Sequence, residues 1–212
     1  MAEENFDKDY WNSKWENAQT GWDIGSPSTA ISEYFLQVEN KNVKILIPGC
    51  GNAHEAELLL EEGFKNITLL DIAPKACEII SKKFSHHEIN VICEDFFNHN
   101  GKYDIIVEQT FFCALHRNLR EKYVEKMASL LHENGKIIGL LFNKDFDKAA
   151  PPFGGNKEEY RKLFENKFEI KKLEECYNSI KPRKNTEVFI NFQKRNINPK
   201  NIKYENKHGH FR

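Results

Sequence analysis

The stretch Val43–Asn52 constrains the fold more than any other part of the sequence. Its first five residues, 43–47, are mostly β-branched or aliphatic, which predicts a buried strand. Gly49 and Gly51 follow, and because neither carries a Cβ atom, the backbone there can turn sharply and approach a ligand closely. The stretch therefore predicts a strand followed by a turn that faces a ligand.

The residues after this turn complete a strand, helix, strand unit that ends in a carboxylate. Residues 53–62 carry apolar side chains at helical spacing and predict an amphipathic helix, with Gly63 as its C-terminal cap. A second apolar strand, predicted over 66–70, is followed directly by Asp71. This layout places Asp71 beside the glycine turn, where its carboxylate can accept hydrogen bonds from both hydroxyls of a ribose.

The glycine turn has a plain alternative, a tight connection that binds nothing. The third glycine of the dinucleotide fingerprint is also absent, because Asn52, Ala53 and His54 follow Gly51. That glycine lets a helix pack closely beneath a pyrophosphate, and a nucleoside without phosphate does not require it. The pattern therefore favours S-adenosylmethionine over NAD, and an NAD-dependent oxidoreductase is the alternative.

Two further predicted strands end in polar residues. Strand 89–93 leads to Asp95, whose carboxylate could accept from an adenine amino group while Phe96 flanks the ring; an acidic loop with core phenylalanines is the alternative. Strand 103–107 leads to a polar triplet, Glu108, Gln109 and Thr110. Ligands of open α/β sheets bind outside the carboxyl ends of the strands, so we expect these segments to share one crevice.

The last strands determine how the sheet finishes. Strands predicted over 167–177 and 186–194 are separated by only eight residues, which is too short for a parallel crossover, so they must be antiparallel. The sequence thus predicts a Rossmann-like α/β fold: a seven-stranded, mostly parallel sheet with a C-terminal antiparallel hairpin and helices on both faces. The remaining predicted elements are a strand at 136–142 and helices at 28–39, 74–84, 117–132 and 157–166.

All three tryptophans precede the first strand. Trp11 and Trp15 are four residues apart and share one face of a short predicted helix, and Trp22 lies in an irregular segment after Gly21. They can be core anchors, but a segment before the first strand is well placed to form a lid. Indole faces attract a sulfonium cation by roughly 0.5–2 kcal/mol per contact.

Composition limits the partners and the location. The 212 residues suggest one domain over 1–195, with an N-terminal lid over 1–40 and a basic, frayed tail over 196–212. With 31 basic and 32 acidic side chains, the net charge of −1 favours neither nucleic acid nor a membrane surface. Five scattered cysteines without a Cys-x-x-Cys pair predict no metal site and fit a reducing cytoplasm. We expect a monomer.

Several segments together resemble the thiopurine S-methyltransferase family, including its thiocyanate, halide and thiol methyltransferase branch. The resemblance covers about residues 10–194, and it rests on the tryptophan-rich lead, the segment Ile47–Asn52, Asp71, Asp95–Phe96, Phe111–Leu115 and Pro151–Phe153. It implies a small-molecule methyl acceptor and S-adenosylmethionine as cofactor. The cofactor-binding residues that it implies are Trp11, Trp15, Trp22, Gly49, Gly51, Asp71, Asp95, Phe96 and Gln109. The acceptor-binding residues that it implies are Phe112, Pro152 and Phe153.

Two of these positions depart from the family. The thiopurine enzymes have an arginine where this chain has Gln109, and the thiocyanate branch has a tyrosine where this chain has Phe153. The expected acceptor is a soft nucleophile such as a thiol, thiopurine, thiocyanate or halide, for which no dedicated base is required. An N- or O-methyltransferase is the enzyme alternative, with Glu108 as the single candidate for a base. A protein that binds adenosine nucleosides without chemistry is the non-enzyme alternative.

Overall fold

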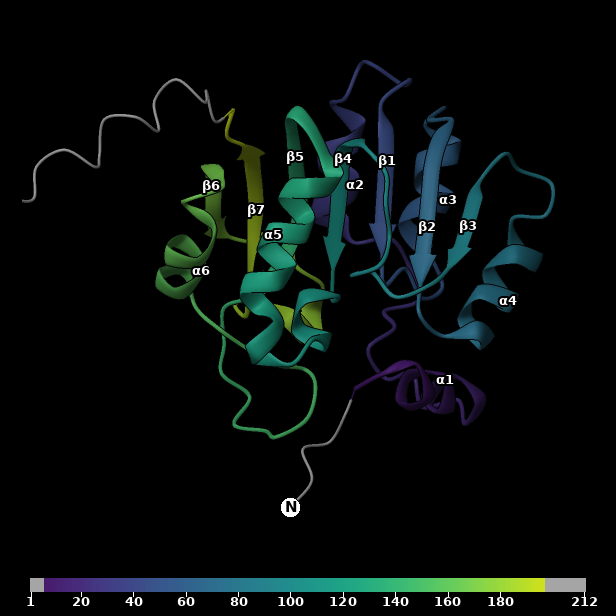
Figure 1. Ribbon diagram of the computed structural model, residues 1–212, viewed down its shortest axis with the longest axis horizontal. Helices are drawn as coiled ribbons and strands as arrows, with labels where there is room; N and C mark the ends of the chain where they lie inside the picture. Colours follow the sequence, from purple (N-terminus) through teal and green to yellow (C-terminus); the bar gives the residue numbers. More distant parts are fainter. Residues whose placement is uncertain (1–5, 197–212) are drawn as a thin grey trace, which may run out of the picture.

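The computed structural model describes residues 6–196, and its centre is one seven-stranded sheet (Figure 1). The strand order is β3-β2-β1-β4-β5-β7-β6. The strands are β1 (Lys44–Pro48), β2 (Asn66–Asp71), β3 (Asn90–Cys93), β4 (Tyr103–Gln109), β5 (Leu131–Phe142), β6 (Phe168–Glu175) and β7 (Glu187–Lys194). The helices are α1 (Lys8–Glu16), α2 (Thr29–Leu36), α3 (His54–Glu61), α4 (Pro74–Lys83), α5 (Arg120–Leu130) and α6 (Lys157–Phe164). Apart from Asn196, the predicted basic tail lies outside the described residues.

The sheet is parallel except at its C-terminal hairpin. β1 pairs in parallel with β2 and β4, and the next pairs outward, β2 with β3 and β4 with β5, are parallel as well. β7 is antiparallel to both β5 and β6. The predicted fold is therefore confirmed. β2 and β3 lie on one side of β1, whereas β4 and the later strands lie on the other side, so the strand order reverses between β1 and β4. Open α/β sheets bind ligands outside the carboxyl ends of the strands at such a switch point.

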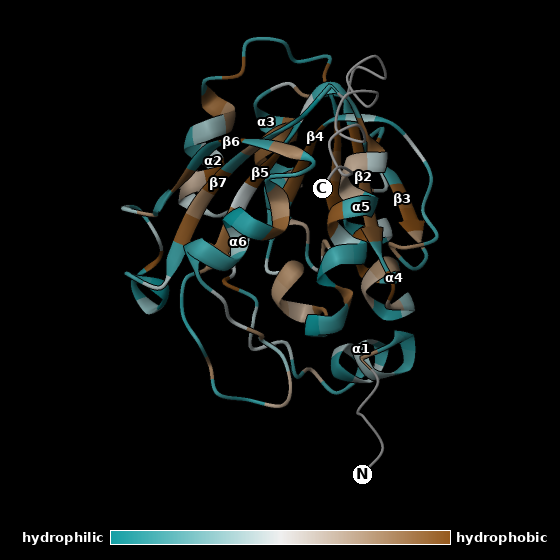
Figure 2. Ribbon diagram, turned by 60° about the vertical axis from the view of Figure 1, so that its left-hand side comes forward, coloured by the Kyte–Doolittle hydropathy of each residue, from teal (hydrophilic) through white to brown (hydrophobic). Residues whose placement is uncertain are grey.

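Both faces of the sheet are buried, which explains why its central strands are apolar throughout. Successive residues of a strand point to opposite faces. Leu46 therefore packs in one hydrophobic cluster with α5 and α6, whereas Ile45 and Ile47 pack in another with α2, α3 and α4. Figure 2 shows the result, with largely hydrophobic strands and with helices in which hydrophilic and hydrophobic residues alternate. Among residues 6–196, no helix is long and apolar enough to cross a membrane.

One predicted helix is shorter than expected. The sequence predicts a helix over 117–132. In the structure, a short 3-10 turn (Arg117–Leu119) precedes α5, and β5 begins at Leu131, directly after the end of α5. Leu131 is fully buried and pairs with Tyr103 of β4, which requires the extended backbone that it adopts (φ −88°, ψ 141°). Strand pairing thus overrides the helical periodicity at this point.

The N-terminal segment approaches the carboxyl ends of the strands. α1 contains no buried residue and lies beyond the ends of β1 and β2, next to the start of α4 (Figure 1). The backbone N–H of Lys75 donates to Asn12 Oδ1 at 2.8 Å and so ties α1 to the start of α4. α2 falls within the predicted lid over 1–40, but it packs in the core through the fully buried Ile31 and Phe35. The lid is therefore limited to residues 6–27.

Candidate active site

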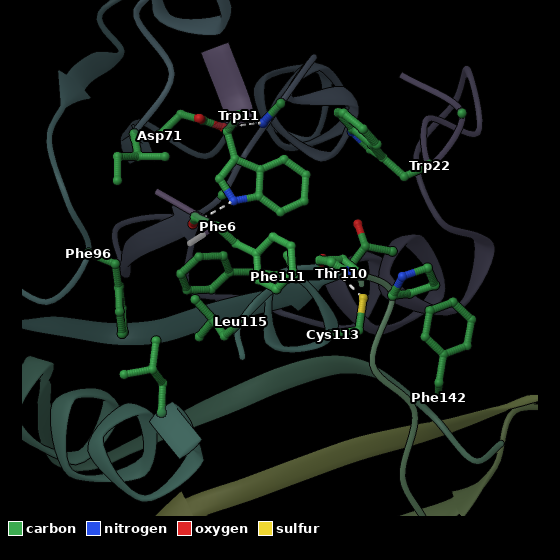
Figure 3. A pocket seen from close by; sticks show the side chains of 18 of the residues that line it. Phe6, Trp11, Trp22, Asp71, Phe96, Thr110, Phe111, Cys113, Leu115 and Phe142 are labelled. Atoms are coloured by element: carbon green, nitrogen blue, oxygen red, sulfur yellow. Dashed lines mark hydrogen bonds between the residues drawn. The ribbon is translucent and has the colours of Figure 1, made fainter. Parts of the chain in front are cut away.

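A cavity of about 640 Å³ lies between the lid and the carboxyl ends of the strands. Its volume is in the range typical of small-molecule sites. In Figure 3, Trp11 and Trp22 come from the lid, and Phe96, Phe111 and Thr110 come from the strand ends. The predicted site residues that line the cavity are Trp11, Trp15, Trp22, Gly49, Gly51, Asp71, Asp95, Phe96 and Pro152.

The glycine turn forms part of the cavity wall. Gly49 and Gly51 have φ angles of +57° and +52°, which side chains rarely tolerate. A Cβ atom on Gly49 would also lie 2.4 Å from Cδ2 of Phe111, and one on Gly51 would lie 3.4 Å from Cζ2 of Trp15. The backbone conformation therefore favours glycine at both positions, and the close packing of the Phe111 ring also favours it at Gly49.

Asp71 joins the end of β2 to this turn. Its Oδ2 accepts from the Gly51 N–H at 3.0 Å, and its Oδ1 accepts from the Ala73 N–H at 2.9 Å. The residue is 8% exposed, and burial raises the pKa of its carboxyl despite these hydrogen bonds. Each carboxylate oxygen can accept more than one hydrogen bond, so Asp71 can still accept from a ligand in the cavity.

The three indoles form one contiguous aromatic surface in the lid. Trp22 packs edge-to-face against Trp11 at a ring separation of 5.4 Å and against Trp15 at 6.1 Å. Trp11 Nε1 donates to the backbone oxygen of Phe6 at 3.1 Å, which fixes the orientation of its ring. The indoles therefore support one another above the glycine turn.

Asp23 fastens the lid to the glycine turn. Its carboxylate accepts from the Gly25 N–H at 2.7 Å and from the Asn52 side-chain amide, and it pairs with Nε2 of His54 at 2.8 Å. Burial alone would raise the pKa of Asp23, but the hydrogen bonds outweigh it and the pKa is lowered. Because Asn52 and His54 lie one and three residues after Gly51, Asp23 links the lid next to Trp22 to the glycine turn.

We expect Asp23→Ala to weaken cofactor binding. Loss of the hydrogen bonds to this carboxylate removes about 1–2 kcal/mol that holds the lid closed. Titration calorimetry with S-adenosylhomocysteine measures the change. Asp9→Ala is the matched control, since Asp9 is an exposed acidic residue of the same lid. Equal affinities for the two variants would contradict the role of Asp23.

Glu108, the candidate base, does not line the cavity. It is fully buried, and its Oε1 accepts from the N–H groups of Phe111 and Phe112 at 2.9 Å each. Its Oε2 accepts from the hydroxyl of Tyr123. Glu108 therefore holds the turn after β4, including Thr110 with its φ of +57°, and places Phe111 under Gly49.

The burial of Glu108 predicts a pH-dependent stability. Burial raises the pKa of Glu108 to about 7, from an ordinary value of 4.5. The folded protein thus keeps a proton that the unfolded chain releases, so this contribution to stability is complete below pH 4.5 and declines as the pH rises to about 7. The decline amounts to roughly 2–3 kcal/mol between pH 5 and 8. Denaturant unfolding of the wild type and Glu108→Gln at both pH values tests this; parallel pH profiles would contradict it.

Three other predicted residues also lie outside the cavity lining. Gln109 ends β4, and its Oε1 is buried without a hydrogen-bond partner among the described residues. Phe112 is 1% exposed and packs against Tyr123 and Tyr160 in the core. Phe153 is buried against rings of the lid and of the turn after β4. The direction of each of these side chains depends on its position in the strand or turn. Residue type alone does not reveal that direction, and here it is away from the cavity.

The sequence did not single out several residues that line the cavity. Glu94 lies there with its Oε1 2.5 Å from Nδ1 of the buried His99, whose Nε2 is 2.8 Å from the Tyr103 hydroxyl. Lys144 and Arg183 line the part of the cavity next to β5 and β7. Both lie in connections without periodicity, so no sequence signal marked them.

Comparison with known proteins identifies the family. The model of the thiopurine S-methyltransferase family matches residues 6–198. The chain belongs to this family. Its relatives include the probable thiol methyltransferase 2 of Arabidopsis thaliana, which is 30% identical over 191 residues, 87% of this chain and 84% of that protein. Thiocyanate methyltransferase 1 of Brassica oleracea is 25% identical over 193 residues, 88% of this chain and 85% of that protein.

Solved structures of other methyltransferases have the same fold as this member of the thiopurine S-methyltransferase family. Magnesium protoporphyrin IX methyltransferase from Synechocystis PCC 6803 with bound S-adenosylmethionine superposes with a TM-score of 0.71 at 15% sequence identity. The match covers 92% of this chain and 100% of that chain. The predicted family resemblance is confirmed. The protein is therefore an S-adenosylmethionine-dependent methyltransferase, and S-directed transfer is the activity for which its family is named.

Proposed function

We propose that the protein transfers the methyl group of S-adenosylmethionine to the sulfur of a small anionic acceptor, such as an ionised thiol. The observation that carries this proposal is the charge distribution along one cavity. Asp71, Glu94 and Asp95 line its end next to β2 and β3. Lys144 and Arg183 line its end next to β5 and β7. A cationic cofactor suits the first end, and an anionic acceptor suits the second.

At the acidic end, the proposed contacts follow the chemistry of the side chains. Asp71 would accept from the ribose hydroxyls, and Asp95 and Phe96 would frame the adenine. Gly49 and Gly51 would let the backbone pass the methionine part. The indoles of Trp11, Trp15 and Trp22 would cover the sulfonium. When bound, the cofactor supplies a methyl group on a positively charged sulfur.

At the basic end, one cation is more available than the other. Arg183 donates to the Trp22 backbone oxygen at 2.8 Å and pairs with Glu187 Oε1 at 3.3 Å. Lys144 makes no ion pair with a carboxylate within the described part of the chain, and its Nζ lies 5.5 Å from the Phe146 ring centre. An anionic acceptor would balance the charge of Lys144, while Phe142 and Pro152 would contact its apolar part.

The aromatic walls support a soft nucleophile. Approach of a thiolate to a sulfonium neutralises charge, and water would stabilise the separated ions more than the transition state. The cavity residues would therefore accelerate transfer by excluding water and by holding the reacting atoms in line. A free thiol has a pKa of about 8.5, so little base is required. The N- or O-directed alternative needs a base, and Glu108, its one candidate, lies outside the cavity lining.

A methyl-transfer screen with labelled cofactor tests the proposal. The panel contains thiols, thiocyanate, iodide, thiopurines and selenium compounds, with 4-mercaptobenzoate and 4-methylthiophenol as a pair of aryl thiols with and without a carboxylate. We expect transfer to sulfur, with Lys144→Ala raising KM for 4-mercaptobenzoate but not for 4-methylthiophenol. Lys148→Ala is the control, since Lys148 is exposed on the same loop and does not line the cavity. Cofactor binding without transfer to any acceptor would overturn the proposal.

The proposal also covers the organisation and location of the protein. We infer a single domain over 1–195 that acts as a monomer in the cytoplasm on small molecules rather than nucleic acid. The five scattered cysteines, without a Cys-x-x-Cys pair, support a reducing compartment.

A further inference from the structure

Two cysteines lie together directly behind the proposed ribose site. Cys93 ends β3 and is exposed, and its strand partner in β2 is Asp71. Cys77 lies in α4, is 6% exposed, and donates through Sγ to the Asp71 backbone oxygen at 3.5 Å. The same oxygen accepts from the N–H of Glu94, the residue after Cys93, at 3.1 Å. Both cysteines are thus held around one carbonyl group.

Packing of α4 against β3 also brings the two thiols near each other. Burial, together with the neighbouring Cys93 thiol, raises the pKa of Cys77. The pair therefore combines a solvent-accessible sulfur with a buried neighbour within reach. This is the arrangement in which an oxidised thiol is resolved by a second one. Cys50, Cys113 and Cys176 are all buried and have no exposed cysteine as a hydrogen-bond partner.

We propose that Cys77 and Cys93 form a reversible disulfide that controls cofactor binding. A hydroperoxide oxidises the Cys93 thiolate to a sulfenic acid and is reduced to the corresponding alcohol, or to water in the case of hydrogen peroxide. The Cys77 sulfur then attacks the Cys93 sulfur and displaces the hydroxyl group, which leaves as water with the Cys77 proton. Two thiols lose two electrons in total, and a dithiol returns them by exchange.

Disulfide formation would alter the cofactor end of the cavity. A disulfide has an S–S length of about 2.05 Å, so the Cys77 sulfur would exchange its hydrogen bond to the Asp71 backbone oxygen for a bond to the Cys93 sulfur. Asp71 and Glu94, which flank the two cysteines, both line the cavity. By linkage, a disulfide that weakens cofactor binding is itself opposed by bound cofactor to the same extent. This coupling rests on the proposed function, whereas formation of the disulfide does not.

Peptide mapping tests the disulfide itself. The full chain is treated with hydrogen peroxide, its free thiols are alkylated, and it is digested with trypsin, which separates the two cysteines by cleaving after Lys82 and Lys83. We expect a cross-linked pair of peptides two hydrogens lighter than their sum, with Cys176 alkylated as the internal control. Cys93→Ser should abolish the cross-link, and Cys176→Ser should not. A wild-type protein in which Cys77 remains a free thiol would overturn the proposal.

Calorimetry with S-adenosylhomocysteine tests the coupling. Oxidation of the wild type should weaken binding by roughly 5- to 150-fold, and dithiothreitol should restore it. Cys93→Ser should bind equally before and after peroxide treatment. Unchanged affinity of the cross-linked wild type would refute the control of cofactor binding. A reduced protein that binds no S-adenosylhomocysteine would refute the proposed function, and the peptides would still decide whether the disulfide forms.

Discussion

Replacing Asp71 by alanine is expected to weaken the binding of S-adenosylhomocysteine by about 1–3 kcal/mol, the usual cost of losing hydrogen bonds to a charged group. Two effects contribute. The ribose hydroxyls lose their acceptor, and the Gly51 N–H loses the carboxylate that orders the glycine turn. Titration calorimetry on the folded variant measures the loss directly.

A matched control separates the ligand effect from a general effect on the sheet. Asp104 is another acidic residue of the sheet that accepts a backbone hydrogen bond, from the Lys44 N–H at 2.8 Å, and it does not line the cavity. Asp104→Ala should therefore leave affinity unchanged. Unchanged affinity of a folded Asp71→Ala protein would remove Asp71 from the cofactor site.

Replacing Gly49 by alanine should destabilise the fold more strongly than any other single methyl addition in the glycine turn. The left-handed conformation costs about 1–2 kcal/mol for a residue with a Cβ atom, and the contact with Phe111 adds about 1–3 kcal/mol of overpacking. A loss of this size should lower Tm by roughly 5–15 °C. Differential scanning calorimetry provides the measurement.

Gly63→Ala isolates the contribution of the Phe111 contact. Gly63 has a φ of +83°, but a Cβ atom there would meet nothing within 4 Å. It should therefore show the conformational cost alone. If Gly49→Ala lowers Tm no more than Gly63→Ala does, the close packing of Phe111 against Gly49 in the structure is contradicted.

The fold could be predicted from sequence because its determinants are local. Apolar runs fix the strands, Gly49 and Gly51 fix the turn, and the eight residues between the last two strands exclude a parallel crossover. The extent of β5 could not be predicted, because Leu131 adopts a strand conformation only through its pairing with Tyr103. Long-range pairing leaves no trace in the periodicity of a single segment.

The candidate site was predictable in the lid, the glycine turn and the ends of β2 and β3, but much less so next to β5 and β7. The cavity-lining residues next to β2 and β3 lie at the carboxyl ends of these strands. Because ligands of open α/β sheets bind outside those ends, the sequence predicts that these residues belong to the site. Glu108 also ends a strand, but its side chain turns inward to bind the Phe111 and Phe112 N–H groups. Arg183 and Lys144 come from irregular connections whose course depends on the whole fold. Their positions required the structure.

A crystal structure with S-adenosylhomocysteine tests the central claim most directly. We predict that the ligand occupies the cavity with its ribose hydroxyls within hydrogen-bonding distance of the Asp71 carboxylate. Its sulfur should lie beneath the indoles of Trp11, Trp15 and Trp22. A ligand bound elsewhere, or a lid folded away from the carboxyl ends of the strands with the ligand in place, would contradict the account.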